Sequence, residues 1–241
     1  MLNWWEGLKA ARKERRRLAK FQKAQAWSAG LGLQETFERI YAEGKWGRSE
    51  DGAPFCSGNG SKPEHSQAYE AYVADFLTAH PDVGRMVDIG CGDFQVSGRV
   101  LARLQRPIAY TGCDIVRPMI EQHQRQHGRP DRTFLVLDAV ADDPPAGDLV
   151  VIRQILQHLS NAHVLAILER ARRLYTWGII TESLPVPKTA ANLDIAPGIA
   201  TRIALGSGVY VDEPPFNLGV IEAFEVPHGP NEVMRTSLVR F

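Results

Sequence analysis

The chain has 241 residues, of which 44% are hydrophobic and 23% are charged, a composition typical of a folded globular domain. Its 28 Lys and Arg residues balance its 28 Asp and Glu residues, so no overall positive field favours a nucleic-acid partner. The three cysteines, Cys56, Cys91 and Cys113, form no Cys-x-x-Cys pair, which argues against a disulfide framework or a bound metal. No apolar run approaches the roughly 20 residues of a membrane span. The N-terminus lacks the apolar stretch of a signal peptide, and we therefore expect a cytoplasmic protein.

Residues 1–28 are predicted to form a basic helical segment that is separate from a domain over residues 29–241. Trp4, Trp5 and Leu8 precede a run of eight basic side chains opposed only by Glu14, namely Lys9, Arg12, Lys13, Arg15, Arg16, Arg17, Lys20 and Lys23. Such a helix can lie on an anionic membrane surface, here the inner face of the membrane, or dock on a partner. The alternative is a solvated helix that caps the domain.

The next segment predicts two helices separated by a long loop. Apolar residues recur at helical spacing over 33–43 and 64–79. Residues 44–63 between them are polar and rich in glycine. A connection of this length is usually a functional lid or a flexible linker.

Strands and helices then alternate along the chain. Strands are predicted at 85–89, 108–113, 133–138, 148–152 and 177–181, and helices at 95–105, 117–127 and 161–174, with Asn161 as a candidate N-cap. This order predicts an α/β fold with a doubly wound, mostly parallel sheet of seven strands. The last two strands, about 221–226 and 233–240, are joined by a hairpin signal at 228–231. A second long loop, 183–218, precedes them.

The stretch from Met86 to Phe94 carries the clearest chemical signal. A short apolar strand reaches Asp88, and the turn Gly90-Cys91-Gly92 follows at once. Glycine lets the backbone approach a ligand closely, because it has no Cβ. A dinucleotide site would need a third glycine where Gln95 stands. The pattern therefore favours a nucleoside that carries a positive group near the acid.

The ends of the following strands supply further candidates. Asp114 follows Gly92 by 22 residues, the spacing at which a carboxylate accepts both ribose hydroxyls in a βαβ unit. Asp138 ends the third predicted strand. Arg153 and Gln154 end the fourth, where a ligand is expected at the switch point of the sheet. A buried Arg153 needs an anionic partner, either a ligand carboxylate, an anionic acceptor or Asp88.

Residues 86–94 resemble motif I of the class I S-adenosylmethionine (SAM) methyltransferases, whose fold is Rossmann-like. The resemblance implies that Asp88, Gly90 and Gly92 bracket the methionine end of SAM. It also implies that Asp138 hydrogen-bonds the adenine amino group, with backbone N–H groups near Ala139 reading the ring edge.

The loop residues are expected to complete the cofactor site. Trp46, Ser57 and Gly58 are predicted to fold over the methionine end, where glycine N–H groups and serine hydroxyls suit a carboxylate.

A wider set of motifs resembles a group of small bacterial methyltransferases, some of them encoded with surface-polysaccharide genes. These motifs are Trp46-Gly47, Ser57-Gly58-x-Gly60-Ser61, residues 91–94, residues 153–160 and Pro215-Phe216-Asn217. The resemblance covers about residues 37–241. Some relatives have an acid where this chain has Gln154, so no carboxylate role is carried over there.

We therefore expect SAM-dependent methyl transfer to a small polar acceptor, such as a hydroxyl or a phosphate-like oxygen on a sugar. His158 is the first choice for a general base, although it can equally be a packed side chain, and Glu182 or Asp194 is the second. An anionic acceptor would need Arg153 or Arg202. Further polar and aromatic residues of the loop 183–218, expected above the sheet, are Asn192, Ser207, Tyr210 and Phe216.

Three alternatives remain open. A carboxyl-rich pocket around Glu182 and Asp194 would favour an N-methyltransferase. A SAM site without an acceptor pocket would indicate a non-catalytic binding protein. Nucleic-acid methylation is disfavoured, because the segment after the fourth strand reads Arg-Gln-Ile-Leu and lacks an Asn/Asp-Pro-Pro-aromatic motif.

Overall fold

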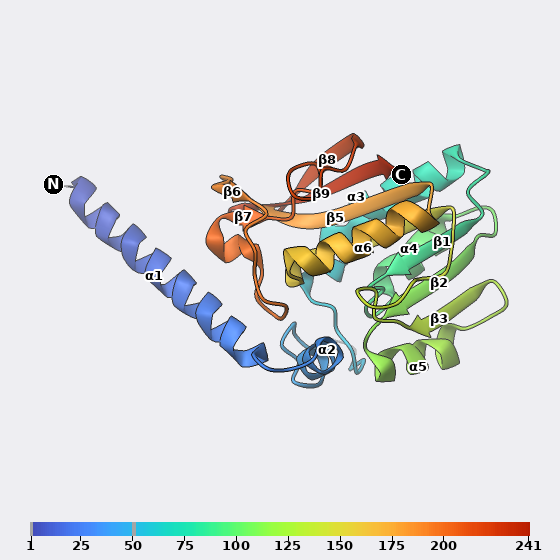
Figure 1. Cartoon of the computed structure of the whole chain (residues 1–241), viewed down its shortest axis with the longest axis horizontal. Helices are drawn as coiled ribbons and strands as arrows, with labels where there is room; N and C mark the ends of the chain where they lie inside the picture. Colours follow the sequence, from blue (N-terminus) through green and yellow to red (C-terminus); the bar gives the residue numbers. More distant parts are fainter. Residues whose placement is uncertain (1, 50–51) are drawn as a thin grey trace.

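A seven-stranded sheet organises the computed structural model, which describes residues 2–49 and 52–241 (Figure 1). The strand order is β3-β2-β1-β4-β5-β9-β8. The first five strands run parallel, and β9 pairs antiparallel with both β5 and β8. The bounds are β1 Arg85–Ile89, β2 Ala109–Asp114, β3 Arg132–Val136, β4 Leu149–Arg153, β5 Trp177–Pro185, β8 Val220–Gly229 and β9 Glu232–Arg240. The predicted doubly wound sheet with a C-terminal antiparallel hairpin is confirmed.

Helices cover both faces of the sheet because successive strand residues point to opposite sides. Val150 and Ile152 of β4 pack in one cluster with helix α6 (Asn161–Leu174), whereas Leu149 and Val151 pack with α3 (Pro63–Ala79) and α4 (Gln95–Arg103). A strand buried on both faces reads as a continuous apolar run, which explains the sequence of β4. Helix α5 (Arg117–His127) packs beside β3.

Two strand ends differ from the prediction, and both differences move a candidate residue. Strand β5 continues to Pro185, because its antiparallel partner β9 extends the ladder to the pair Pro185–Glu232. Glu182 is therefore inside β5 and does not end it. Strand β3 stops at Val136, so Asp138 lies two residues beyond the strand, in the following turn.

The start of α6 also differs from the prediction. Ser160, not Asn161, is the N-cap, and its hydroxyl accepts a hydrogen bond from the backbone N–H of His163 at 3.3 Å. The Asn161 side chain is drawn away into the loop 183–218, where it donates to the carbonyl of Asn192 at 2.7 Å. Asn161 thus connects two segments rather than capping its own helix.

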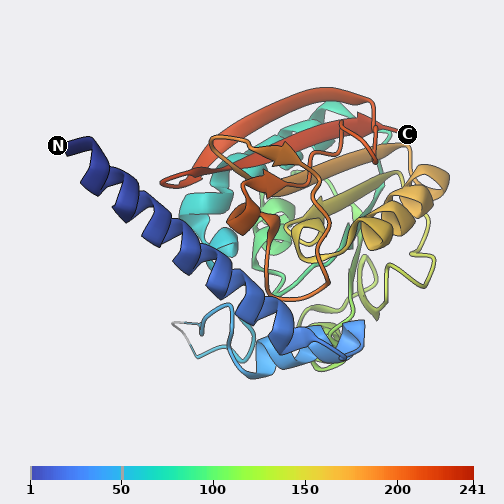
Figure 2. The same cartoon turned by 60° about the vertical axis from the view of Figure 1, so that its left-hand side comes forward.

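Helix α1 (Leu2–Ser28) projects from the domain in both views (Figures 1 and 2). Gly30, which has a positive φ of 81°, follows the end of the helix, the place where such a glycine is common. Helix α2 (Leu33–Ala42) follows directly. Trp4 belongs to α1, but its side chain lies outside the described residues. Within the described ranges, no helix is both long and apolar enough to cross a membrane.

The loop 183–218 is held against the sheet by Arg202, whose side chain is fully buried. Beyond the end of β5, this loop contains two short strands, β6 (Ala190–Ala191) and β7 (Ser207–Gly208). The guanidinium donates to the carbonyls of Leu193 at 2.7 Å and Leu159 at 2.7 Å, and to Asn161 Oδ1 at 2.8 Å. It also donates to the carbonyl of Leu156 at 3.2 Å. Arg202 is therefore fully engaged by the protein and is not available for an anionic acceptor.

Replacing Arg202 should destabilise the whole domain. Arg202→Met leaves several buried carbonyl groups without donors, so we expect a loss of about 3 kcal/mol or more in the free energy of unfolding. Arg202→Lys should recover only part of it, because an ammonium lacks the planar fork. Urea unfolding measures the effect, with Arg125→Met, an exposed position on α5, as the matched control. A wild-type midpoint for Arg202→Met would contradict this role.

Candidate active site

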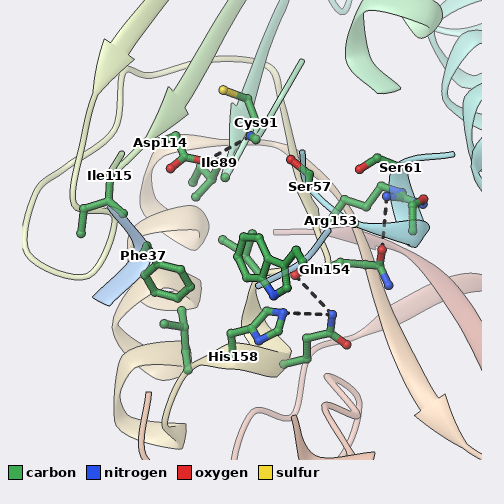
Figure 3. A pocket seen from close by; sticks show the side chains of 18 of the residues that line it. Phe37, Ser57, Ser61, Ile89, Cys91, Asp114, Ile115, Arg153, Gln154 and His158 are labelled. Carbon is green, nitrogen blue, oxygen red and sulfur yellow. Dashed lines mark hydrogen bonds between the residues drawn. The ribbon is translucent and has the colours of Figure 1, made fainter. Parts of the chain in front are cut away.

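A cavity of about 400 Å³ opens at the carboxyl ends of β1, β2 and β4, the edge where ligands bind in open α/β sheets. It brings together all the residues predicted to bind the cofactor, and the first-choice base, namely Trp46, Ser57, Gly58, Asp88, Gly90, Gly92, Asp114, Asp138, Ala139, Arg153 and His158. In Figure 3, Asp114, Ile115 and Phe37 lie on one side of the cavity, and Ser61, Arg153 and Gln154 lie on the other. Glu182 does not line it.

The glycine turn forms the floor of the cavity. Gly90 and Gly92 have φ values of 76° and 53°, conformations that side chains rarely adopt. A Cβ on Gly90 would lie 2.3 Å from Cγ2 of Ile155. The backbone N–H groups of Gly90 and Cys91 donate to the carbonyl of Cys113 at 2.8 and 3.0 Å. These two groups are therefore not available to a ligand. The turn is thus a rigid support pressed against β2 and β4.

Asp114 is fixed by two backbone hydrogen bonds. Oδ2 accepts from the N–H of Gly92 at 3.1 Å, and Oδ1 accepts from the N–H of Val116 at 3.0 Å. Burial raises the pKa of Asp114, and the two backbone hydrogen bonds oppose that shift. Each carboxylate oxygen keeps a further lone pair, so the group can still accept a pair of hydroxyls from the cavity.

Asp88 is almost completely buried below the turn. Its Oδ2 accepts from Ser97 Oγ at 2.5 Å and from Tyr110 OH at 2.9 Å. Burial raises the pKa of Asp88 to about 6, despite these hydrogen bonds. At neutral pH the carboxylate is charged and favours a cationic group in the cavity.

Arg153 ties the end of β4 to the loop 44–63. Its Nη2 donates to the carbonyl of Gly60 at 2.6 Å, and its guanidinium carbon lies 5.2 Å from the centre of the Tyr69 ring. Burial lowers the pKa of Arg153. The hydrogen bonds of Asp88 go to Ser97 and Tyr110 rather than to Arg153, so the alternative of a direct Asp88–Arg153 pair is not observed.

The loop 44–63 closes over the glycine turn through a reciprocal pair of hydrogen bonds. The N–H of Ser57 donates to Asp93 Oδ2 at 2.9 Å, and the N–H of Asp93 donates to Ser57 Oγ at 2.8 Å. Farther along, a Cβ on Gly60 would lie 1.7 Å from Gln154 Oε1, so a larger residue there would displace the Gln154 side chain. Residues 50 and 51 of this loop lie outside the described residues.

Sequence reasoning assigned no role to two residues of this closure, Asp93 and Tyr41. Tyr41 OH lies 2.9 Å from Ser57 Oγ. Asp93 belongs to the Cys-Gly-Asp-Phe motif, so its position was visible. Its partner lies 36 residues away in the chain, and nothing in local sequence indicates that pairing.

His158 lines the cavity as a neutral side chain of defined tautomer. Its Nδ1 lies 3.1 Å from the carbonyl of Gly198, and because a carbonyl only accepts, Nδ1 carries the proton. Nε2 therefore has a lone pair, and its protein neighbour, Gln157 Nε2, is 3.5 Å away. Burial lowers the pKa of His158 to about 4. The Trp46 ring centre lies 5.2 Å from that of His158.

Glu182 lies outside the cavity and supports the turn that carries His158. Its oxygens accept from the N–H groups of Leu156 at 2.9 Å and Gln157 at 3.1 Å. Burial raises the pKa of Glu182 to about 8. Asp194, the other carboxylate considered as a base, accepts from the N–H groups of Asn161 and Ile195 at 2.7 and 3.0 Å and also lies outside the cavity lining.

The end of the cavity beside Asp138 is largely apolar. Asp138 accepts from the N–H of Val140 at 2.9 Å and so also stabilises its own turn. Apolar residues that share this end are Ile115, Leu137, Ala139 and Val140. We call the rest of the apolar lining the apolar end; it consists of Leu33, Phe37, Trp46, Ile199 and Ile203. Phe37 and Trp46 pack in one cluster with Ile115, so the two apolar regions adjoin each other.

The polar loop residues expected above the sheet do not reach the cavity. Asn192, Asp194, Arg202, Ser207, Tyr210 and Phe216 are absent from its lining. Asn192, for example, donates to the carbonyls of Tyr210 at 2.9 Å and Pro214 at 2.8 Å. These residues hold the loop 183–218 together, and Ile199, Thr201 and Ile203 face the cavity in their place.

Comparison with known proteins agrees with this geometry. Residues 87–178 match the protein family described as a methyltransferase domain. No curated protein matches the sequence.

Several solved structures share the fold. The N-methyltransferase NodS from Bradyrhizobium japonicum WM9, in complex with S-adenosyl-L-homocysteine (SAH), has a TM-score of 0.55 and 12% identity, over 86% of this chain and 97% of NodS. Magnesium protoporphyrin IX methyltransferase (ChlM) from Synechocystis PCC 6803, with bound SAM, has a TM-score of 0.55 and 15% identity, over 88% and 99%. The SAH-bound N-terminal domain of EvdMO1 has a TM-score of 0.51 and 13% identity, over 85% and 95%.

The buried carboxylate of Glu182 should govern part of the pH dependence of stability. Its pKa in the folded state, about 8, is above the unfolded value, so the unfolded chain loses this proton first. Stability should therefore fall as pH rises from about 4.5 to 8, by about 1 kcal/mol per pH unit.

Glu182→Gln should flatten this slope. Urea unfolding at several pH values measures it, and Glu121→Gln, an exposed position on α5, is the control. An unchanged slope in Glu182→Gln would show that Glu182 does not titrate in this range.

Proposed function

We propose that this chain, which belongs to the class I SAM-dependent methyltransferase superfamily, transfers the methyl group of SAM to a hydroxyl oxygen of a small polar acceptor such as a sugar. SAM supplies an electrophilic methyl group on a sulfonium. The protein contributes binding, orientation, exclusion of water and a site for the hydroxyl proton.

The residues present fit the cofactor. The Asp114 carboxylate, held at the end of β2, would accept the ribose hydroxyls. Asp138 and Ala139 would bind adenine in the end of the cavity that Ile115, Leu137 and Val140 also line. The charged Asp88 below the Gly90–Gly92 turn would favour the positive end of the molecule.

The loop 44–63 would complete the methionine end. Arg153, half-buried beside Tyr69, is the basic group nearest this end and would bind a carboxylate. Trp46, Ser57 and Gly58 would cover it, supported by the Ser57–Asp93 hydrogen bonds.

The observation that carries the choice of acceptor is His158. Its Nδ1–H is engaged by Gly198. Its Nε2 lone pair, which faces the Gln157 amide nitrogen at 3.5 Å, would accept a hydroxyl proton in place of that long hydrogen bond. A phosphate-like acceptor has less support, because Arg202 is enclosed by carbonyl groups and Arg153 would already bind the carboxylate of the methionine end. The N-methyl alternative loses the carboxylates on which it depended, since Glu182 and Asp194 lie outside the cavity.

A sugar acceptor has one further support among the proteins of similar fold. The N-terminal domain of EvdMO1 was also crystallised in the presence of SAH and D-fucose. A hydroxyl-bearing ring would suit the part of the cavity that Trp46 and His158 line, because an aromatic face packs against the apolar face of a sugar.

The setting of the reaction is also a proposal. Cys56, Cys91 and Cys113 are free thiols, which supports a reducing compartment such as the bacterial cytoplasm. Residues 1–28 and 29–241 would be two functional units, the second being the catalytic domain with lids 44–63 and 183–218. Residues 1–28 would place the enzyme at the inner face of the membrane.

Loss of the Asp114 carboxylate should weaken cofactor binding. We expect Asp114→Ala to bind SAH about 10- to 100-fold less tightly, because a hydrogen bond to a charged group contributes about 1.5–3 kcal/mol. Isothermal titration calorimetry measures the affinity, with Asp75→Ala, an exposed position on α3, as the control. Equal affinities of Asp114→Ala and the wild type would refute the ribose assignment.

Loss of His158 should impair transfer but not cofactor binding. With isotopically labelled SAM and a panel of methyl glycosides, sugar phosphates and alkylamines, label should enter the glycosides. His158→Ala should lower that rate about 100-fold or more with SAH affinity unchanged. Because the pKa of His158 is lowered to about 4, the base form persists at neutral pH. With saturating SAM, which removes the effect of Asp88 on cofactor binding, the rate should show no inflection near pH 6.5.

His127→Ala, an exposed position on α5, is the matched control. Label entering only sugar phosphates or amines, or full turnover by His158→Ala, would overturn the proposed acceptor class or the proposed base.

A further inference from the structure

Helix α1 presents a charged surface that the domain does not use. Every described side chain from Trp5 to Lys20 is exposed, and both views show this part of the helix extending away from the sheet (Figures 1 and 2). The helix holds eight of the 28 basic residues of the chain and only two of its 28 acids, Glu6 and Glu14. A net-neutral chain therefore concentrates positive charge on one projecting element.

The basic residues are ordered along one face. Lys9, Lys13, Arg16, Lys20 and Lys23 follow one another at alternating intervals of four and three residues, so they form a single stripe along the helix. We call these five residues the basic stripe. Trp5 continues the stripe toward the N-terminus, four residues before Lys9, and is 62% exposed.

The two acids of α1 leave the stripe uncompensated. Glu14 is bonded to Arg17 at 2.6 Å, a basic residue outside the stripe. Helical periodicity places Glu14 away from the stripe, and Glu6, three residues before Lys9, adjoins only its first cation. The stripe thus presents a row of cations to a partner.

The other end of α1 is anchored firmly. Gln25 Nε2 donates to the carbonyl of Ala196 at 3.0 Å, and the N–H of Ala196 donates to Gln25 Oε1 at 2.9 Å. Ser28 Oγ donates to the carbonyl of Pro197 at 3.0 Å. The Trp27 ring also contacts two cations of the following segment, Arg39 at 4.6 Å and Lys45 at 5.1 Å. The basic stripe therefore has a set direction relative to the domain.

This anchor adjoins the apolar end of the cavity. Gly198, next to the anchoring residue Pro197, accepts the hydrogen bond from His158. Ile199 follows at once and lines the cavity, and so does Leu33, the first residue of α2. The surface that α1 contacts is thus close in the chain to the two segments that wall the apolar end.

We propose that α1 is a docking arm that lies on an anionic lipid bilayer through the basic stripe and Trp5. Three observations favour a lipid bilayer over an acidic protein or a nucleic acid as the partner of α1. The cations complement anionic headgroups. The stripe ends in a tryptophan, a residue that prefers the membrane–water interface. The root of the arm lies beside an apolar part of the cavity. The inference does not depend on the methyl-transfer chemistry.

Sedimentation of the full chain with vesicles tests the proposal. Wild type should pellet with vesicles of phosphatidylcholine mixed with phosphatidylglycerol and not with phosphatidylcholine alone, and added salt should release it. The variant K13Q/R16Q/K20Q/K23Q should bind the anionic vesicles with an affinity at least about tenfold lower than that of the wild type. Trp5→Ser should also weaken binding and leave its salt dependence intact.

A matched control removes the same charge elsewhere. The variant R117Q/R125Q/R129Q/R173Q changes four exposed arginines of the domain and should bind like the wild type. Circular dichroism checks that each variant is folded. SAH affinity should be unchanged in every variant, so a failure of vesicle binding is distinguishable from a failure of the methyltransferase assignment.

Several outcomes would overturn the proposal. One is equal binding to neutral and anionic vesicles, and another is a stripe variant that binds like the wild type. An α1-dependent dimer in analytical ultracentrifugation, or α1-dependent retention of a DNA duplex, without vesicle binding would assign the basic stripe to a second copy or to nucleic acid instead.

Discussion

The turn after β4 is the constraint on which the candidate site depends. Its N–H groups at Leu156 and Gln157 are accepted by the buried carboxylate of Glu182, and its carbonyls at Leu156 and Leu159 receive the buried guanidinium of Arg202. The backbone groups of a buried turn need hydrogen-bond partners. Here Glu182 accepts from the N–H groups, and Arg202 donates to the carbonyl groups. His158 is carried by this turn, so its position follows from two side chains that never touch the cavity.

The same logic connects the long loops to the sheet. Arg202 belongs to the loop 183–218 and brings Ile199 and Ile203 to the apolar end of the cavity. At the other end, Arg153 and Asp93 each bind a backbone group of the loop 44–63. Charged side chains thus hold both long loops in place, and the neutral imidazole of His158 lines the cavity between them.

Local sequence patterns predicted the frame well, because they report local physics. The apolar run at 148–152 is typical of a strand buried on both faces, as β4 is. The positions of Asp88, Gly90 and Asp114 follow from strand ends that meet at one edge of the sheet. Predictions were wrong where a distant partner decides. Pairing with β9 extends β5 beyond Glu182, and Asn192 and Tyr210 turn inward to satisfy the backbone of their own loop.

The sequence by itself determined the alternation of strands and helices, the glycine turn and the basic character of residues 1–28, since these depend on residue type and short spacing. The tertiary structure alone decided which polar side chains face the cavity. Glu182, Asp194 and Arg202 are residue types that are common in active sites. In this structure, however, each forms hydrogen bonds with backbone groups that are distant in the chain. Whether a polar residue serves a ligand or the fold depends on which hydrogen-bond partners burial brings to it, and no local pattern records that.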